Sequence, residues 1–262
     1  MRYGVSFSLE LPQQVQMAKD AGFDYVECGF GMLSRTNDAT FDAYRQALDD
    51  SGIRCEAANC FIPGDLKIIG TDYAREEMTQ FLKNGFSRGA QLGLQTVVFG
   101  SGGARALPDG VRFDDGFRQL GAFLRDVVSP LAAQYGVTVV IEPLRKAETN
   151  MIHTLDEGAM LAALANRDNI SCLADVYHMW GAGETFDDIR RLKGCIRHGH
   201  ISNPETPNKE AKRTFPLERD EFNYGGFVSA LADAGCARCS IEARCYDFPS
   251  EIKKAGKVLC SL

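Results

Sequence analysis

One phrase recurs along this chain: an amphipathic segment, then a glycine, then a short apolar run. A glycine just past a helix end takes the left-handed conformation that stops the helix, and a β-rich run directly after it forms a strand. The phrase marks five helix-to-strand junctions, at Gly22, Gly52, Gly93, Gly136 and Gly235. Three further strands are expected in the segments YGVSF at 3–7, NISCLAD at 169–175 and CIRHGHI at 195–201.

Eight strands with helical segments between them are typical of consecutive βα units, which build parallel sheets. The length of 262 residues fits a (β/α)8 barrel. A doubly wound sheet is the competing fold, but no GxGxxG fingerprint follows the first strand, and the glycine-rich segment 100–110 lacks the P-loop lysine. Because no Pro- or Ser-rich linker divides the chain, we expect one TIM-barrel domain over residues 1–262.

Composition limits the partners and the compartment. The net charge of −6 provides no basic footprint for nucleic acid or an anionic membrane, so the expected partner is a small molecule. The N-terminal segment MRYGVSFSLELPQQ contains neither a signal-peptide core nor a membrane-spanning run. Nine scattered cysteines indicate reduced thiols instead of a disulfide framework, and together these features predict a cytoplasmic protein.

Polar residues stand at the ends of the expected strands, where a barrel carries its active site. Four of them follow apolar runs on four successive strands: Glu142, Asp175, His200 and Glu242. Three carboxylates held close together repel one another strongly unless a cation neutralises them. One imidazole with three carboxylates suits one divalent metal, Mn²⁺ first, with Mg²⁺ or Co²⁺ as alternatives. Glu27 and the stretch 56–59 are further polar strand ends, with no role assigned.

The remaining histidines of this region have different expected roles. His198 lies two residues before His200, so both side chains point to the same face of a strand. We expect His198 one layer deeper, as a core or supporting histidine. His178 belongs to the loop that leaves the sixth strand, from which its side chain can reach a bound substrate.

The runs IEPLRKAETN, LADVYHM, HGHIS and SIEAR resemble the sugar isomerase and epimerase superfamily with a xylose-isomerase-like barrel, in particular its ketose 3-epimerase (tagatose or psicose epimerase) branch. The resemblance implies that Glu142, Asp175, His200 and Glu242 bind the metal. It also implies that Glu142 and Glu242 form the acid/base pair. Substrate contacts are implied for Glu148, His178 and Arg213.

Two departures from the family pattern bear on the substrate contacts. The family often has Asn-Arg where this chain has Arg145 and Lys146. The run NPETPNKEAK also separates Arg213 from His200 by more residues than in the family. Lys209, Lys212 and Arg244 are therefore alternatives for the role of Arg213, and these basic residues are candidates for a carboxylate or phosphate on the substrate.

These features predict a metal-dependent isomerase, an epimerase of a sugar or sugar derivative. It would transfer a proton next to the carbonyl of a ketose or keto-sugar through a metal-stabilised enediolate. A dehydratase acting on a keto-inositol would use the same metal and base, and stays an alternative. An abasic-site endonuclease needs several histidines, yet none precedes His153. A non-catalytic sugar-binding barrel would not need all four ligands. A homo-oligomer is compatible with the sequence.

Overall fold

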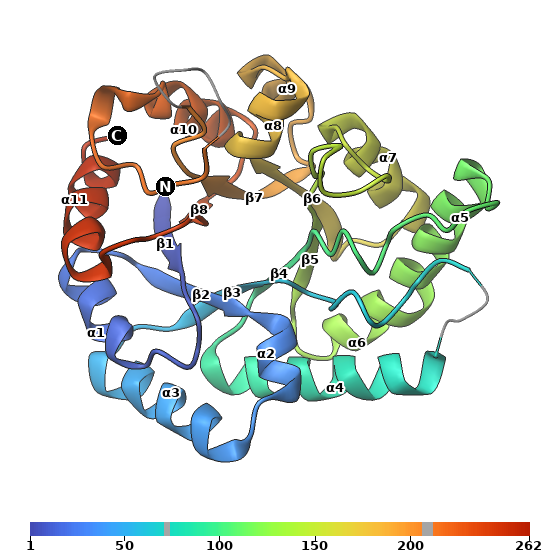
Figure 1. Cartoon of the computed structure of the whole chain (residues 1–262), viewed down its shortest axis with the longest axis horizontal. Helices are drawn as coiled ribbons and strands as arrows, with labels where there is room; N and C mark the ends of the chain where they lie inside the picture. Colours follow the sequence, from blue (N-terminus) through green and yellow to red (C-terminus); the bar gives the residue numbers. More distant parts are fainter. Residues whose placement is uncertain (71–73, 206–211) are drawn as a thin grey trace.

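The computed structural model describes residues 1–70, 74–205 and 212–262. Eight parallel strands close into a barrel in the ring order of the chain, and helices surround it (Figure 1). This arrangement confirms the predicted (β/α)8 fold. The strands are β1 (Arg2–Ser6), β2 (Tyr25–Gly29), β3 (Cys55–Asn59), β4 (Thr96–Phe99), β5 (Thr138–Ile141), β6 (Ile170–Asp175), β7 (Ile196–Ile201) and β8 (Arg238–Ile241).

The helices follow the strands in the order expected of βα units. A π-helical turn at Leu124–Val128 joins two of them between β4 and β5, and a 3₁₀ turn lies at Arg219–Glu221. The helices are α1 (Gln13–Asp20), α2 (Phe30–Arg35), α3 (Asp38–Ser51), α4 (Arg75–Leu92), α5 (Phe113–Phe123), α6 (Ser129–Ala133), α7 (Leu155–Ala165), α8 (Val176–Ala182), α9 (Phe186–Arg191), α10 (Tyr224–Asp233) and α11 (Phe248–Cys260).

The five junction glycines have the backbone that the sequence pattern predicts. Their φ angles lie between 68° and 93°. Gly52 and Gly93 are the C-caps of α3 and α4, and a strand follows each within a few residues. A side chain with a Cβ rarely adopts this left-handed conformation, so these positions end the helices where the pattern places them.

The N-terminal end of the barrel contains an ion cluster around Glu56. This position corrects the expectation that Glu56 is one of the polar residues at the C-terminal ends of the strands. Glu56 is the second residue of β3, and its carboxylate accepts from Arg2 at 2.7 Å and from Arg238 at 3.0 Å. Both arginines begin their strands, so Glu56 lies at the N-terminal end of the barrel, opposite the predicted site. Above this cluster, Val98, Val140 and Leu173 form a buried apolar layer inside the ring.

All nine cysteines are free thiols. Within the described ranges, none of the helices has the length and apolar character needed to cross a membrane.

Candidate metal and active site

The four predicted ligands lie together at the C-terminal mouth of the barrel. Asp175 ends β6, His200 lies on β7, and Glu142 and Glu242 are the first residues after β5 and β8. One donor atom of each lies within 4.8 Å of the others. The convergence follows from the parallel register, in which Asp175 pairs with His200 and the neighbouring strands end at the same level.

The spacing of the donor atoms fits a hard divalent cation. Nδ1 of His200 lies 2.8 Å from Glu242 Oε2, 3.1 Å from Glu142 Oε1 and 3.7 Å from Asp175 Oδ2. Bonds of about 2.1 Å to such a cation place its ligand atoms about 3 to 4.2 Å from one another. Three carboxylate oxygens and one imidazole nitrogen also match the ligands that Mn²⁺ and Mg²⁺ accept.

Arg213 lies against the same carboxylates. Its Nη2 atom donates to Asp175 Oδ2 at 2.5 Å and to Glu242 Oε2, and its Nε atom donates to the main-chain oxygen of Glu242 at 2.8 Å. Burial alone would lower the pKa of Arg213, but the charges of Asp175 and Glu242 raise it well above its usual value. The guanidinium therefore stays charged and offsets part of the negative charge of the cluster.

The two candidate acid/base glutamates have different affinities for a proton. Burial and, after it, the negative charge of Glu242 raise the pKa of Glu142 to about 7. Burial also acts to raise the pKa of Glu242, but the charges of Arg213 and His200 outweigh it and hold this pKa below its usual value. In the metal-free protein, Glu142 therefore accepts a proton more readily than Glu242.

A second buried cluster supports His200 from below. Glu27 on β2 accepts from Nε2 of His200 across 3.0 Å, and its other oxygen lies 3.2 Å from Nε2 of His198. All three side chains are completely buried. His198 is thus a supporting histidine one layer deeper than His200, as the alternation along β7 predicts.

The four predicted metal ligands, Glu142, Asp175, His200 and Glu242, are called the ligand cluster below. The residues predicted to contact the substrate border this cluster. Nη1 of Arg213 lies 3.1 Å from Nε2 of His178, and Glu148 Oε1 lies 3.9 Å from His178 Nδ1. Burial lowers the pKa of His178, so the ring is neutral and its Nε2 accepts from Arg213. Of the alternatives to Arg213, Lys212 and Arg244 lie nearby, whereas Lys209 lies outside the described residues.

Three supporting residues were not assigned from the sequence. Glu27 orients His200, and Asn59 donates from Nδ2 to Glu242 Oε1 at 2.8 Å. Glu27 and Asn59 are among the polar residues noted at strand ends in the sequence, and this position is the signal that could have identified them. Arg105 is completely buried and donates to the main-chain oxygens of Glu142 at 2.9 Å, Phe99 at 3.1 Å and Ile152 at 3.3 Å. No pattern in the sequence distinguishes Arg105 from a surface arginine.

Pockets adjoin the mouth on two of its sides, among the residues that the structure describes. One, of about 730 Å³, lies among the loops after β2, β3 and β4 and includes Met32, Cys60 and Ile62. The other, of about 460 Å³, is lined by Arg145, Glu148, Tyr177, Lys212, Arg213 and Arg244, and we call it the basic pocket.

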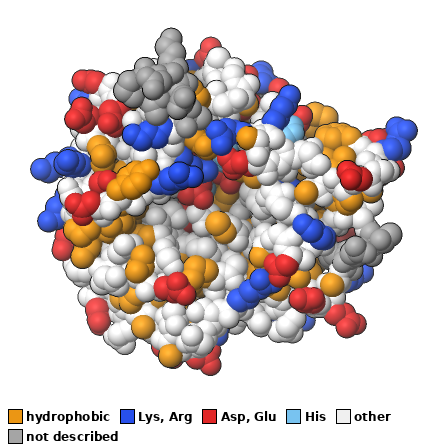
Figure 2. Space-filling model, in the orientation of Figure 1, with side chains coloured by type: hydrophobic (Ala, Val, Ile, Leu, Met, Phe, Trp, Pro, Cys, Tyr) orange, Lys and Arg blue, Asp and Glu red, His pale blue; other side chains and the backbone are white. Residues whose placement is uncertain are grey.

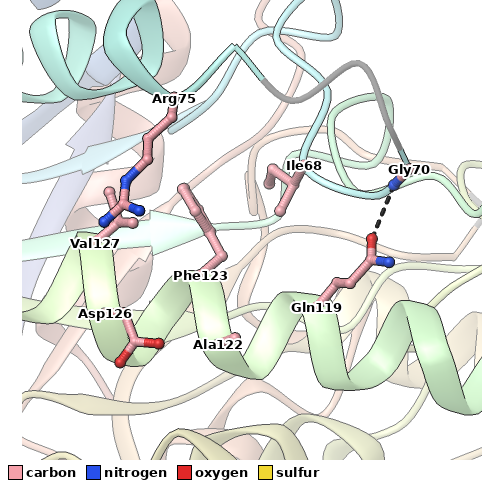
Figure 3. A pocket seen from close by; sticks show the side chains of 8 residues that line it. All are labelled: Ile68, Gly70, Arg75, Gln119, Ala122, Phe123, Asp126 and Val127. Carbon is pink, nitrogen blue, oxygen red and sulfur yellow. Dashed lines mark hydrogen bonds between the residues drawn. The ribbon is translucent and has the colours of Figure 1, made fainter.

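A further pocket lies on the flank of the barrel, between the start of α4 and the segment formed by α5 and the π-helical turn that follows it (Figure 3). Its volume is about 470 Å³, and Gln119 accepts there from the main-chain nitrogen of Gly70 at 2.8 Å. None of its lining residues belongs to the ligand cluster, so we assign it no part in the chemistry.

Comparison with known proteins identifies the family. Residues 15–262 match the family described as xylose isomerase-like TIM barrel. The chain belongs to this family. The match confirms the resemblance seen in the four strand-end motifs, and it covers every residue of the candidate site.

Relatives of this xylose isomerase-like barrel include sugar epimerases. The D-psicose 3-epimerase of Agrobacterium fabrum (strain C58) is 23% identical over an alignment of 247 residues, and the match covers 87% of this chain and 83% of that protein. A crystal structure of D-psicose 3-epimerase in the presence of D-fructose aligns with a TM-score of 0.78 at 17% identity, covering 100% and 98% of the two chains. The apo 3-keto-D-glucoside 4-epimerase from E. coli aligns with a TM-score of 0.77 at 17% identity, covering 100% and 99%.

Proposed function

We propose that this protein is a divalent-metal-dependent sugar isomerase or epimerase acting next to the carbonyl of a ketose or keto-sugar. The observation that carries the proposal is the convergence of Glu142, Asp175, His200 and Glu242 within 4.8 Å at the barrel mouth. The similarity to ketose and keto-glucoside epimerases supports a sugar as the substrate.

In this proposal the four residues hold one cation, with Mn²⁺ as the first choice. When bound, the cation supplies Lewis acidity that stabilises the negative charge developing on the substrate carbonyl oxygen. The chain's own contribution is to hold the ligand atoms in place. Glu27 fixes the ring of His200, and Asn59 and Arg213 fix the carboxylate of Glu242.

Glu142 and Glu242 are the proposed base and acid. They follow β5 and β8, which lie three places apart in the ring, so their carboxylates reach the centre from different sides. A proton removed from one face of a carbon and returned from the other inverts that carbon, which is the requirement of epimerisation. A positioned carboxylate contributes about 10² to 10⁴-fold to such a transfer.

His178, Glu148 and Arg213 are the proposed substrate contacts. They form a continuous polar wall beside the ligand cluster, since Arg213 contacts both His178 and the carboxylates. A sugar presents hydroxyl groups that both donate and accept, and this wall offers a guanidinium donor, a neutral imidazole and a carboxylate acceptor.

We also propose that residues 1–262 form one domain and that the protein works in the cytoplasm. The pairing of β1 with β8 supports the first point, because the first and last strands belong to the same closed sheet. The nine free thiols are consistent with a reducing compartment.

The deciding experiment is proton NMR in D₂O with added Mn²⁺ and a panel of ketoses and keto-inositols. It compares the wild type with Glu142→Gln and Glu242→Gln, after circular dichroism has shown that each variant folds. Deuterium entering a C–H next to the carbonyl, without water loss and only in the wild type, supports the proposal.

Other outcomes count against it. Loss of water from the substrate would make the protein a dehydratase, as considered from the sequence. A metal-loaded sample that exchanges no proton on any compound would contradict proton transfer on this panel. If Glu142→Gln exchanged as fast as the wild type, Glu142 would not be the base.

A further inference from the structure

The barrel mouth has one strongly basic side. The basic pocket brings four cations, Arg145, Lys212, Arg213 and Arg244, together with one carboxylate, Glu148. This concentration is unexpected in a chain whose net charge is −6. Figure 2 shows Lys and Arg side chains bordering the hollow in the middle of this face, on the side where Figure 1 places β7 and β8.

Two of the four charges are already compensated. Arg213 pairs with Asp175 and Glu242 in the ligand cluster. Arg145 pairs with Glu148 at 3.0 Å, and its guanidinium lies 4.3 Å from the centre of the Tyr177 ring. These contacts hold the guanidinium group of Arg145 against Glu148 and Tyr177 in the lining of the basic pocket.

Lys212 and Arg244 have no ion-pair partner in the part of the chain that the structure describes, and both are exposed. The backbone nevertheless holds them together. The main-chain nitrogen of Arg244 donates to the oxygen of Arg213 at 2.9 Å, and Thr214 forms a parallel bridge with Arg244. Two like charges on bridged segments repel each other, so an anion between or beside them is favoured there.

We propose that the substrate is an anionic keto-sugar whose phosphate or carboxylate group binds in the basic pocket to Lys212 and Arg244, with Arg145 beside them. This inference rests on the proposed function, because Arg213 and Tyr177 join the pocket to the cluster where the carbonyl end would react. Guanidinium and ammonium groups form short, charge-assisted hydrogen bonds with such anions. Their field also raises the local concentration of an anionic substrate.

The kinetic test uses three compounds that share a C2 carbonyl and differ at C6: D-fructose, D-fructose 6-phosphate and D-fructuronate. Rates of proton exchange in D₂O with Mn²⁺ give kcat/KM for each. We expect at least a tenfold higher kcat/KM for one of the two anionic compounds, and the faster of them identifies phosphate or carboxylate as the recognised group. Equal values for all three would overturn the inference.

The variant test uses Lys212→Ala combined with Arg244→Ala. We expect the ratio of kcat/KM for the anionic compound to that for D-fructose to fall at least tenfold. Added salt should lower the same ratio in the wild type, since these charges are exposed and screened. Lys83→Ala, an exposed lysine on α4, is the matched control and should keep the wild-type ratio. An unchanged ratio in the double variant would overturn the inference.

A binding test separates this inference from the proposed function. Inorganic phosphate is titrated calorimetrically into metal-free wild type, the double variant and Lys83→Ala. Binding that is lost only in the double variant supports the anion site even if no compound exchanges a proton, in which case only the catalytic proposal fails. Proton exchange on D-fructose without phosphate binding and without anionic preference overturns the anion site and leaves the catalytic proposal intact. Absence of phosphate binding together with absence of exchange contradicts both.

Discussion

Glu27 Oε1 lies 3.0 Å from Nε2 of His200, across the interior of the barrel from β2 to β7. Burial alone would raise the pKa of Glu27, but the charge of His200 and the hydrogen bonds from both histidines hold it well below its usual value. An ionised Glu27 therefore accepts from Nε2, which turns Nδ1 of His200 toward Glu142 and Glu242.

This contact predicts that Glu27→Gln weakens metal binding without removing a ligand. Partners of a ligating histidine typically change metal affinity by about 10 to 100-fold, and we expect a loss in this range for Mn²⁺ in a calorimetric titration. Glu56→Gln is the matched control, a buried glutamate on the neighbouring strand that pairs with Arg2 and Arg238. Equal Mn²⁺ affinity in wild type and Glu27→Gln would show that Glu27 does not orient His200.

Metal binding itself should stabilise the fold. A ligand present at 100 times its dissociation constant adds about 2.7 kcal/mol, which raises the Tm of a chain of this size by about 5 °C. We expect this shift when Mn²⁺ is added to chelator-treated wild type, with one ion per chain by elemental analysis. His200→Ala should show neither the shift nor the ion; a bound stoichiometric ion in this variant would place the site elsewhere.

Arg105 should be required for the stability of the region around Glu142. Burial lowers the pKa of Arg105 to about 10, so it stays protonated at neutral pH and donates to three main-chain oxygens. Arg105→Met leaves those buried acceptors without their donor, at a cost on the order of 3 kcal/mol in the free energy of unfolding measured with urea. Arg118→Met, at an exposed arginine, should change it by less than about 0.5 kcal/mol. A loss of the same size in both variants would contradict the role of Arg105.

Glu184 should make stability depend on pH. Burial raises its pKa from 4.5 to about 7, although the main-chain nitrogen of Leu155 donates to it at 2.8 Å. Between these values the folded chain binds more protons at this group than the unfolded chain does, so the group's contribution to stability falls as the pH rises from 4.5 to 7.

Glu184→Gln keeps the acceptor and removes the charge. We expect it to raise the Tm by about 2 °C at pH 8 and to leave the Tm nearly unchanged near pH 3.5, where Glu184 is protonated in both the folded and the unfolded chain. Asp109→Asn, an exposed acid in a loop, is the control and should show no such difference. An equal shift at both pH values would mean that a packing change and not the lost charge is responsible.

The local pattern of this sequence was enough to predict the barrel and the convergence of four polar residues at its mouth. Apolar runs after glycines with left-handed backbone specify where helices end and strands begin, since backbone geometry is set by neighbouring residues. The C-terminal ends of parallel strands lie at the same end of a closed barrel. Polar residues at successive strand ends, such as Asp175 and His200, therefore meet there. The family motifs in the same four runs supplied the expectation of a sugar.

Contacts between strands on opposite sides of the ring could not be predicted from the sequence, because they form only in the closed barrel. Between β2 and β3 the register shifts, so that Val26 pairs with Cys55 and Glu27 with Ala57, and Glu56 lies between the two pairs. Simple alternation therefore could not tell that Glu27 faces the site while Glu56 faces the opposite end.

Likewise, His200 lies 173 residues from Glu27 and Arg105 lies 37 residues from Glu142, so no short-range pattern links either pair. Ring closure and side-chain packing bring these residues together. The sequence alone determined the type and order of the elements and which polar residues meet at the mouth, because those follow from local backbone geometry. The tertiary structure alone decided which buried charges contact the four residues at the mouth and which cations line the basic pocket, because those depend on how distant segments pack.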